Sequence, residues 1–353
     1  MRNLTETAYY TRRAINWAIL AVIMYVILRT TWTILVAVWL AVFPPQAPPP
    51  NYKFGKLPAI KFPQEASMSA QFTYNLETIE GKVPNASSSG VVYFMPKTPA
   101  NLLALSRTQE FAKRLGLDPK PIQESKNLYR FDDPIAPLRR LRFDIVSGNF
   151  ILRYGFEQDT GFFTEHNFPS VEAAIAEAKS LMQTYNLYVP DIAKGANKTT
   201  FLKLVGDKLV KTTSLSQADA MRLDFFRQNV GSMKVFAPNP DEGPVSFVYS
   251  GSRNAKKKIL QLAYTFWPID YQTTGTYALK PSTQAWEELG QGNGYIARAP
   301  TNDSTTVVVR QVYLGYYDSF DPQTYLQPIY VFEGDYGFMA FVGAVTGEWT
   351  EAP

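Results

Sequence analysis

The chain of 353 residues contains no cysteine and a single histidine, His166. Without thiols there is no disulfide, no thiolate nucleophile and no cysteine-ligated zinc site. One histidine cannot build a multi-histidine metal site, and no Gly-x-Ser-x-Gly segment, Walker loop or His-Glu-x-x-His helix occurs. The sequence therefore predicts no cofactor, no metal site and no catalytic residue.

A basic main body is also missing, although the net charge of the whole chain is +4. The first 62 residues hold seven basic residues and one acid. Residues 63–353 hold 28 basic and 30 acidic residues, so this part is slightly acidic. A nucleic-acid-binding protein needs a basic face on its folded body. The charge distribution therefore predicts no nucleic-acid partner.

Residues 14–43 form a nearly continuous apolar run. At ~1.5 Å per residue, a helix over this run would be ~45 Å long. A bilayer core requires only ~20 residues, or ~30 Å of helix. A cleaved signal peptide would be shorter and would end at small residues, whereas this run ends in Pro44-Pro45. We predict an uncleaved single-pass anchor over 14–43 that contacts the lipid bilayer, with a cytoplasmic tail over 1–13.

The flanking charges favour one orientation of this anchor. Arg12-Arg13 adjoin the apolar run directly, whereas Lys53, Lys56 and Lys61 are spread behind a proline-rich spacer. Basic residues next to a span favour the cytoplasmic side. The expected location is the cell membrane, with a cytoplasmic amino terminus and an extracytoplasmic main body.

Arg29 lies within the apolar run. If the hydrocarbon core spans residues 23–43, the guanidinium group is close enough to one edge to reach the headgroups, a behaviour known as snorkelling. Alternatively, Arg29 pairs with an acidic residue in the membrane helix of a partner. Because of this second interpretation, Arg29 is a candidate partner-binding residue.

The segment 44–63 is rich in proline and lacks helical or alternating periodicity. Proline favours the extended polyproline conformation. We interpret the segment as a stiff stalk that lifts the main body off the membrane.

After residue 63, strand-like runs dominate and helices are isolated, which predicts an α+β fold. Residues 141–156 read as a β-hairpin with Ser147-Gly148-Asn149 at its turn. The weak boundary at 188–199 divides the body into two lobes of antiparallel sheet with isolated helices, over 64–190 and 200–353. Helices are expected at 105–115, 170–185, 216–229 and 282–289.

The last 75 residues contain a short helix, a strand ending in Leu314-Gly-Tyr-Tyr317, the segment Pro328-Ile-Tyr-Val-Phe332 and a closing strand. This order resembles the carboxyl-terminal part of YycH/YycI-type extracytoplasmic regulators with PepSY-like repeats. The chain is also similar to uncharacterised anchored envelope proteins of small-genome bacteria. The first resemblance implies a non-enzymatic regulatory module that acts on a membrane sensor or an envelope protein, and it transfers no catalytic residue.

Aromatic residues gather where the predicted strand 306–317 leads into the next loop. Core packing is one interpretation. The other is a recognition surface, since aromatic residues are enriched in interface cores. The candidate partner-binding residues of this cluster are Tyr313, Tyr316, Tyr317, Phe320 and Tyr325.

Two functional classes remain open. The first is an anchored extracytoplasmic binding or regulatory protein without catalysis, which acts on a membrane or envelope partner. The second is an envelope hydrolase that uses a carboxylate pair or a carboxylate-bound metal. Its carboxylates would come from Asp132-Asp133, Glu287-Glu288 and Asp318/Asp321. Under the first class, we expect these carboxylates in solvated turns.

The run Lys256-Lys257-Lys258 is expected to be exposed.

Overall fold

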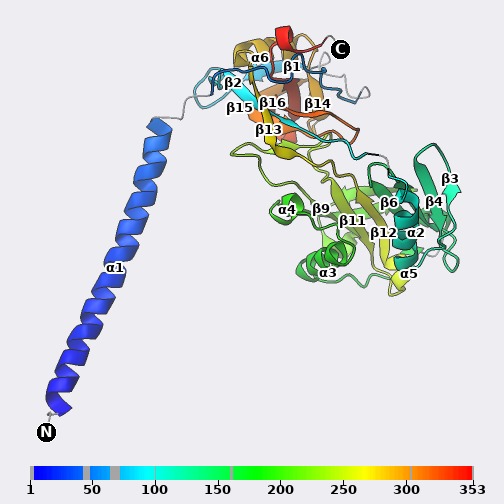
Figure 1. Cartoon of the computed structure of the whole chain (residues 1–353), viewed down its shortest axis with the longest axis horizontal. Coiled ribbons are helices and arrows are strands. Elements are labelled where there is room, and N and C mark those ends of the chain that lie inside the picture. Colours follow the sequence, from blue (N-terminus) through cyan, green and yellow to red (C-terminus); the bar gives the residue numbers. More distant parts are fainter. Residues whose placement is uncertain are drawn as a thin grey trace. The chain divides into compact units, whose positions relative to one another are not determined.

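The structure is a computed structural model that describes residues 4–42, 48–63, 72–99, 101–159, 162–302 and 304–351. The chain forms two compact units, Met1–Pro48 and Pro49–Pro353 (Figure 1). The fold class is α+β, as predicted, with an amino-terminal apolar helix followed by a body of mainly antiparallel sheets and a few helices.

The first unit is a single helix, α1 (Leu4–Val42). Its stretch Tyr9–Val36 is long and apolar enough to cross a membrane. The hydroxyl groups of Thr30 and Thr31 donate hydrogen bonds of 2.9 and 2.8 Å to the carbonyl of Ile27. Because these bonds satisfy the hydroxyls within the helix, the threonines cost little in hydrocarbon. The predicted end of the anchor, Phe43, lies outside the described residues.

The body contains an eight-stranded and a nine-stranded sheet. The eight-stranded sheet has the central order β1-β15-β16-β17-β14, in which β1 and β10 pair with β15 in parallel and the other pairs are antiparallel. Its strands are β1 (Thr73–Leu76), β2 (Ser89–Phe94), β10 (Val235–Phe236), β13 (Asp270–Ala278), β14 (Tyr295–Arg298), β15 (Thr306–Tyr317), β16 (Tyr325–Gly334) and β17 (Met339–Gly343).

The nine-stranded sheet is antiparallel and has the order β3-β4-β5-β6-β12-β11-β9-β7-β8. Its strands are β3 (Ile122–Gln123), β4 (Leu128–Asp132), β5 (Arg139–Asp144), β6 (Phe150–Tyr154), β7 (Asn197–Val205), β8 (Lys208–Thr212), β9 (Ala220–Phe225), β11 (Val245–Ser250) and β12 (Ile259–Tyr264). The predicted hairpin is confirmed as β5 and β6, with Gly148 at a φ of 77° in the turn.

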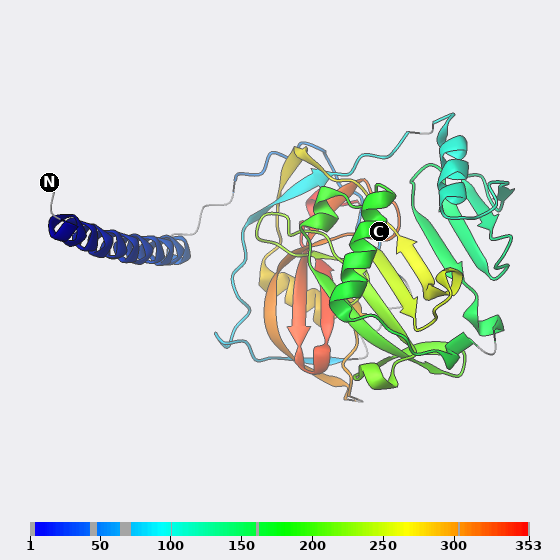
Figure 2. The ribbon, with the colours of Figure 1, turned by 90° about the horizontal axis from the view of Figure 1, so that it is seen from below.

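The helices of the body are α2 (Ala104–Arg114), α3 (Val171–Thr184), α4 (Pro190–Ala193), α5 (Ala255–Lys258) and α6 (Ser282–Gly290). Three predicted helices are confirmed as α2, α3 and α6, and the Ser170 side chain caps α3 by accepting a hydrogen bond from the Ala173 amide. Figure 2 shows α3 against the strands of the nine-stranded sheet. There Ala174, Ala178 and Met182 share a core with that sheet.

The helix predicted at 216–229 is wrong. After a short 3-10 turn, Leu215–Gln217, the chain forms β9 in the interior of the nine-stranded sheet. Met221, Leu223 and Phe225 alternate with Arg222 and Asp224 and enter the core that α3 covers. Apolar side chains at every second residue favour a strand here, and the sequence Ser216-Gln-Ala-Asp219 does not start a helix.

The predicted lobe ranges do not follow the sheets. Strands β1 and β2, from the range 64–190, belong to the eight-stranded sheet, and β9, β11 and β12, from the range 200–353, belong to the nine-stranded sheet. Hydrogen-bonding between strands that are distant in the chain sets this arrangement. A boundary at 188–199 therefore does not separate the sheets.

The stalk predicted at 44–63 is corrected from Pro49 onward, where the chain belongs to the body. The Tyr52 ring stacks on Trp349 with centroids 3.7 Å apart, and Leu57 is fully buried. The Leu57 amide also donates to the Trp349 carbonyl. Apolar side chains between the prolines therefore fasten this segment to the body instead of leaving it extended in solvent.

Candidate functional site: a cavity where the chain crosses between the sheets

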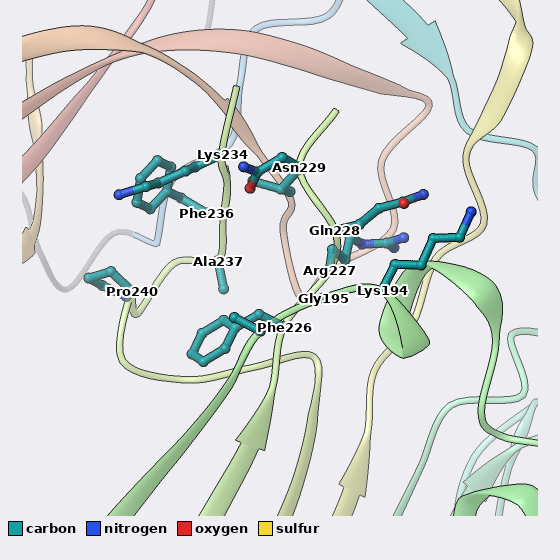
Figure 3. A pocket seen from close by; sticks show the side chains of 12 residues that line it. Lys194, Gly195, Phe226, Arg227, Gln228, Asn229, Lys234, Phe236, Ala237 and Pro240 are labelled. Carbon is teal, nitrogen blue, oxygen red and sulfur yellow. The ribbon is translucent and has the colours of Figure 1, made fainter. Parts of the chain in front are cut away.

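The chain leaves the nine-stranded sheet after β9, adds β10 to the eight-stranded sheet and returns as β11. This crossing, together with the residues between α4 and β7, lines a cavity of about 690 Å³ (Figure 3). Small-molecule sites commonly have volumes of roughly 300–1,000 Å³. The lining consists of Lys194, Gly195, Ala196, Phe226, Arg227, Gln228, Asn229, Lys234, Val235, Phe236, Ala237 and Pro240.

One wall of the cavity is a close contact between two backbone segments. The Phe226 amide donates a hydrogen bond of 2.9 Å to the Ala196 carbonyl. At Gly195, an added Cβ would lie 1.8 Å from the Phe226 carbonyl oxygen. Glycine is therefore required at position 195, because any side chain would force these segments apart.

The polar groups of the lining favour an anionic ligand. Lys194, Asn229 and Lys234 are exposed, and Figure 3 shows the two lysines toward opposite ends of the lining. No carboxylate lines the cavity, and neither lysine forms an ion pair with any residue in the described ranges. Phe226 and Phe236 also belong to the lining, and Figure 3 shows Phe236 beside Lys234. The cavity can therefore receive a negatively charged group together with an apolar part.

Arg227 lies at the buried side of the cavity and connects elements of both sheets. Its Nη1 donates to Asp191 Oδ2 in α4 at 3.1 Å, and its Nε donates to Asp318 Oδ2, just after β15, at 2.5 Å. Its Nη2 donates to the Trp267 carbonyl, and its guanidinium carbon lies 4.1 Å from the centre of the Phe266 ring. Each of the three nitrogens donates one hydrogen bond, so Arg227 is held firmly in the wall of the cavity.

The carboxylates of this network differ in their surroundings. Asp191 Oδ1 accepts hydrogen bonds from Gln228 at 2.8 Å and from the Tyr271 hydroxyl at 2.9 Å. Burial, reinforced by the bond to Asp191, raises the pKa of Tyr271 to about 12. Burial also raises the pKa of Asp318, although Arg227 opposes this shift. The structure thus corrects our expectation that Asp318 is a solvated turn residue.

The predicted aromatic cluster does not form one surface. Tyr316 and Tyr317 are each 1% exposed and point to opposite faces of β15. Tyr316 packs on Tyr93, and its hydroxyl donates to the Val91 carbonyl at 2.9 Å. Tyr317 packs on Phe62 in a different core. Complete burial of these two tyrosines supports the core-packing interpretation.

The other three aromatic residues are partly exposed. The Tyr313 hydroxyl donates to Glu333 at 2.5 Å, and its ring lies 5.9 Å from the Lys234 ammonium. Tyr325 packs on Phe54, and the Phe320 carbonyl accepts a hydrogen bond from the Trp267 indole. The Tyr313 side chain is therefore close to Lys234 of the cavity, and the backbones of Tyr316 and Tyr317 pair with Val235 and Phe236 of its lining. Arg29 belongs to the separate helical unit, where it is exposed.

The expectation of three exposed lysines is also corrected. Lys256, Lys257 and Lys258 form the one-turn helix α5, and each ammonium contacts a different carboxylate. The partners are Asp133 at 2.8 Å, Asp159 at 2.6 Å and Glu177 at 2.6 Å. Asp133 is almost completely buried and is also bound by Arg139. These lysines fasten three segments of the nine-stranded-sheet region to α5.

The alternative function, a hydrolase with a carboxylate pair, would need a groove that contains carboxylates. Such a groove, of about 460 Å³, lies on the nine-stranded sheet. Its carboxylates are Glu157, Asp207, Asp224, Asp241 and Glu242, and burial raises the pKa of Asp224. Asp224 and Glu242 bind the same Arg222 guanidinium, at 2.9 and 3.1 Å, and Asp241 binds Lys198, Lys211 and Arg298. Asp224 also accepts the Gly243 amide, so its oxygens are occupied. Across the described ranges, no group of three His, Cys, Asp or Glu residues could hold a metal ion.

Comparisons with known proteins give no family. No protein-family model matches the chain, and no curated protein matches it. Among solved structures, the chain is similar to the crystal structure of an uncharacterized protein from Eubacterium rectale ATCC 33656. The identity is 15%, the alignment covers 81% of this chain and 98% of that chain, and the TM-score is 0.41. A likeness at this level supports no conclusion about function.

The residues around the cavity were missed by reasoning from the sequence. Lys194 and Lys234 are ordinary isolated lysines in loops, and only the crossing between the sheets brings them to one cavity. Arg227 carried a signal, because it directly follows the apolar pair Phe225-Phe226. A charge next to buried aromatic residues indicates a buried partner. The incorrect helix at 216–229 obscured that signal.

Proposed function

We propose that the chain is a single-pass, membrane-anchored binding protein that regulates a membrane or envelope partner and catalyses no reaction. In this proposal, α1 crosses the membrane, the amino terminus is cytoplasmic and the body lies outside the cytoplasm. The competence of Tyr9–Val36 to span a bilayer supports the anchor. The similarity to YycH/YycI-type regulators stays a prediction, and a regulatory role agrees with it.

One observation carries the binding function: among the described residues, the cavity at the sheet crossing has two lysines without an ion pair and no carboxylate in its lining. Its ligand class is a molecule or side chain with a carboxylate or phosphate and an adjacent apolar group. The apolar group would contact Phe226 and Phe236, while Lys194 and Lys234 would attract the anion. The hydrogen bonds of Arg227 and the close backbone contact at Gly195 hold one wall of the cavity in place.

Phenyl phosphate, which combines both chemical groups, is a direct probe of this proposal. We expect calorimetric binding to the full chain in detergent that weakens with added salt. Lys194→Gln and Lys234→Gln should each weaken it by roughly tenfold, the equivalent of one lost charge-assisted contact. The exposed Lys203 on β7 gives the matched control, because Lys203→Gln removes the same charge away from the cavity.

Equal affinity in all three variants would refute the cavity as the binding site. Hydrolysis of the bound probe by the purified chain would refute the non-catalytic part of the proposal. The regulatory part is tested by co-purification of a membrane partner with the anchored chain and with the body alone. Reporter fusions at Pro353 test the orientation, which requires reporter activity outside the cytoplasm.

A further inference from the structure

A second cavity, of about 840 Å³, lies between the amino-terminal end of α2, the β5–β6 turn and the segment that follows α3. We call it the α2 groove. Phe111 forms its base, with the rings of Phe143 and Tyr185 at 5.5 and 5.6 Å. Its lining residues are Thr98, Pro99, Asn101, Leu102, Leu103, Ala104, Arg107, Thr108, Phe111, Phe143, Ile145, Val146, Ser147, Gly148, Tyr185 and Leu187.

Two large apolar side chains at the rim of this groove are uncovered. Leu102 is 102% exposed and Leu103 is 57% exposed. A single exposed leucine is ordinary on a protein surface, but adjacent exposed leucines beside an apolar cavity form a continuous patch. Such patches mark sites where another molecule removes the side chains from water.

The groove also has a defined electrostatic character. Arg107 is the only charged residue in its lining, and it forms no ion pair with a residue in the described ranges. The Arg107 amide donates to the Leu103 carbonyl, so the two side chains lie one helical turn apart. A ligand that covers Leu103 would therefore bring its next group within reach of Arg107, and a carboxylate there would form a bidentate pair.

We propose that the α2 groove docks a segment of a partner protein that presents apolar side chains to Leu102, Leu103 and Phe111 and a carboxylate to Arg107. The concave shape and the single cation favour a peptide segment over a bilayer surface, which attracts clusters of several basic residues. The inference rests on the proposed function only in requiring a protein partner. It involves neither Lys194 nor Lys234, so the cavity experiment and the groove experiment can fail separately.

Peptide display on the immobilised full chain tests this proposal without a known partner. We expect enriched peptides to combine Leu, Ile or Phe with Asp or Glu. Selection on Arg107→Glu should replace the acidic residues with Lys or Arg, because the charge that the groove recognises is reversed. Lys113→Glu is the matched control, since this exposed lysine lies on the same helix outside the groove.

A synthetic peptide from the wild-type selection then measures the apolar contacts. The Leu102→Asp/Leu103→Asp variant should weaken its binding by at least about tenfold, and unfolding curves that match the wild type would show that the fold is retained. Absence of enrichment, an unchanged charge preference in Arg107→Glu, or an equal effect of Lys113→Glu would overturn the proposal. A dimer that the double leucine variant dissociates would also overturn it, because the occupant would then be a second copy of the chain.

Discussion

The two sheets of the body bury their apolar side chains in different ways. Strand β16 of the eight-stranded sheet is buried on both faces from Leu326 to Phe332, and separate cores lie on either side of it. The nine-stranded sheet has one face covered by α2 and α3, while its other face carries a smaller apolar cluster and the groove with Arg222 and Asp224. A strand buried on both faces reads as a continuous apolar run, whereas a strand with one polar face alternates.

This difference explains where reasoning from the sequence succeeded. The sequence predicts a strand over 306–317, and the structure places β15 there. A register shift between Val309 and Gln311 lets this strand bury Val309 and Val312, which strict alternation would place on opposite faces. In the other sheet, the alternating β9 was mistaken for a helix. Polar residues therefore weaken the strand pattern of a short segment more than that of a long one.

The largest effect is expected at the buried network that joins the two sheets. Arg227→Met would leave the carboxylates of Asp191 and Asp318 without their cation, which should cost about 3–5 kcal/mol of unfolding free energy. Urea unfolding of the full chain in detergent measures this loss. Adding Asp191→Asn and Asp318→Asn should recover much of it, because the uncompensated charges are then removed. Equal stability of the single and triple variants would show that the charges do not matter.

A large effect is also expected within the eight-stranded sheet, where the tyrosines alternate between two cores. Tyr317→Ala should destabilise the body by about 3–5 kcal/mol, the range for removing a large buried aromatic side chain. Ile79→Ala is the control, since Ile79 is fully exposed and should change stability by no more than about 0.5 kcal/mol. A small effect of Tyr317→Ala on unfolding would revive Tyr317 as a surface recognition residue.

In the nine-stranded sheet, acid should release the contacts of α5. Burial would raise the pKa of Asp133, but hydrogen bonds from Lys256, the Ile135 and Ala136 amides and Arg139 outweigh burial and lower it to about 2. The ordinary pKa of an aspartate is about 3.9, so this stabilisation is complete above that value. It is lost as the pH falls toward about 2.

Thermal unfolding between pH 5 and pH 2 should therefore show a smaller acid-induced loss of stability for Asp133→Asn than for the wild type. Asp207→Asn, in the exposed turn between β7 and β8, should leave the acid profile unchanged. Identical profiles of the wild type and Asp133→Asn would contradict the lowered pKa of Asp133.

The smallest effect concerns the helices that cover the nine-stranded sheet. Ser170 caps α3 with its side chain, whereas α2 begins at Leu103 without a side-chain cap. Ser170→Ala should therefore cost about 1 kcal/mol, and Ser170→Asp should retain most of the stability. Chemical denaturation compares these variants, and a loss in Ser170→Asp equal to that in Ser170→Ala would argue against a capping role.

The sequence alone determined the features that depend on neighbouring residues. The apolar run indicated a helix able to span a membrane, Ser170 indicated the start of α3, and Ser147-Gly148-Asn149 indicated a hairpin turn. Helix periodicity, capping and turn conformation act over a few residues, so they can be read directly from the chain. A local pattern also suffices to predict the long strand β15.

Only the tertiary structure decided which distant residues meet. It fastened residues 49–63 to the body, divided the strands between two sheets regardless of their order and paired Arg227 with Asp191 and Asp318. It also brought Lys194 and Lys234 to one cavity, although no local pattern distinguishes these lysines. Strand pairing and buried charge compensation depend on long-range contacts, which are set by the packing of the whole body and not by any one segment.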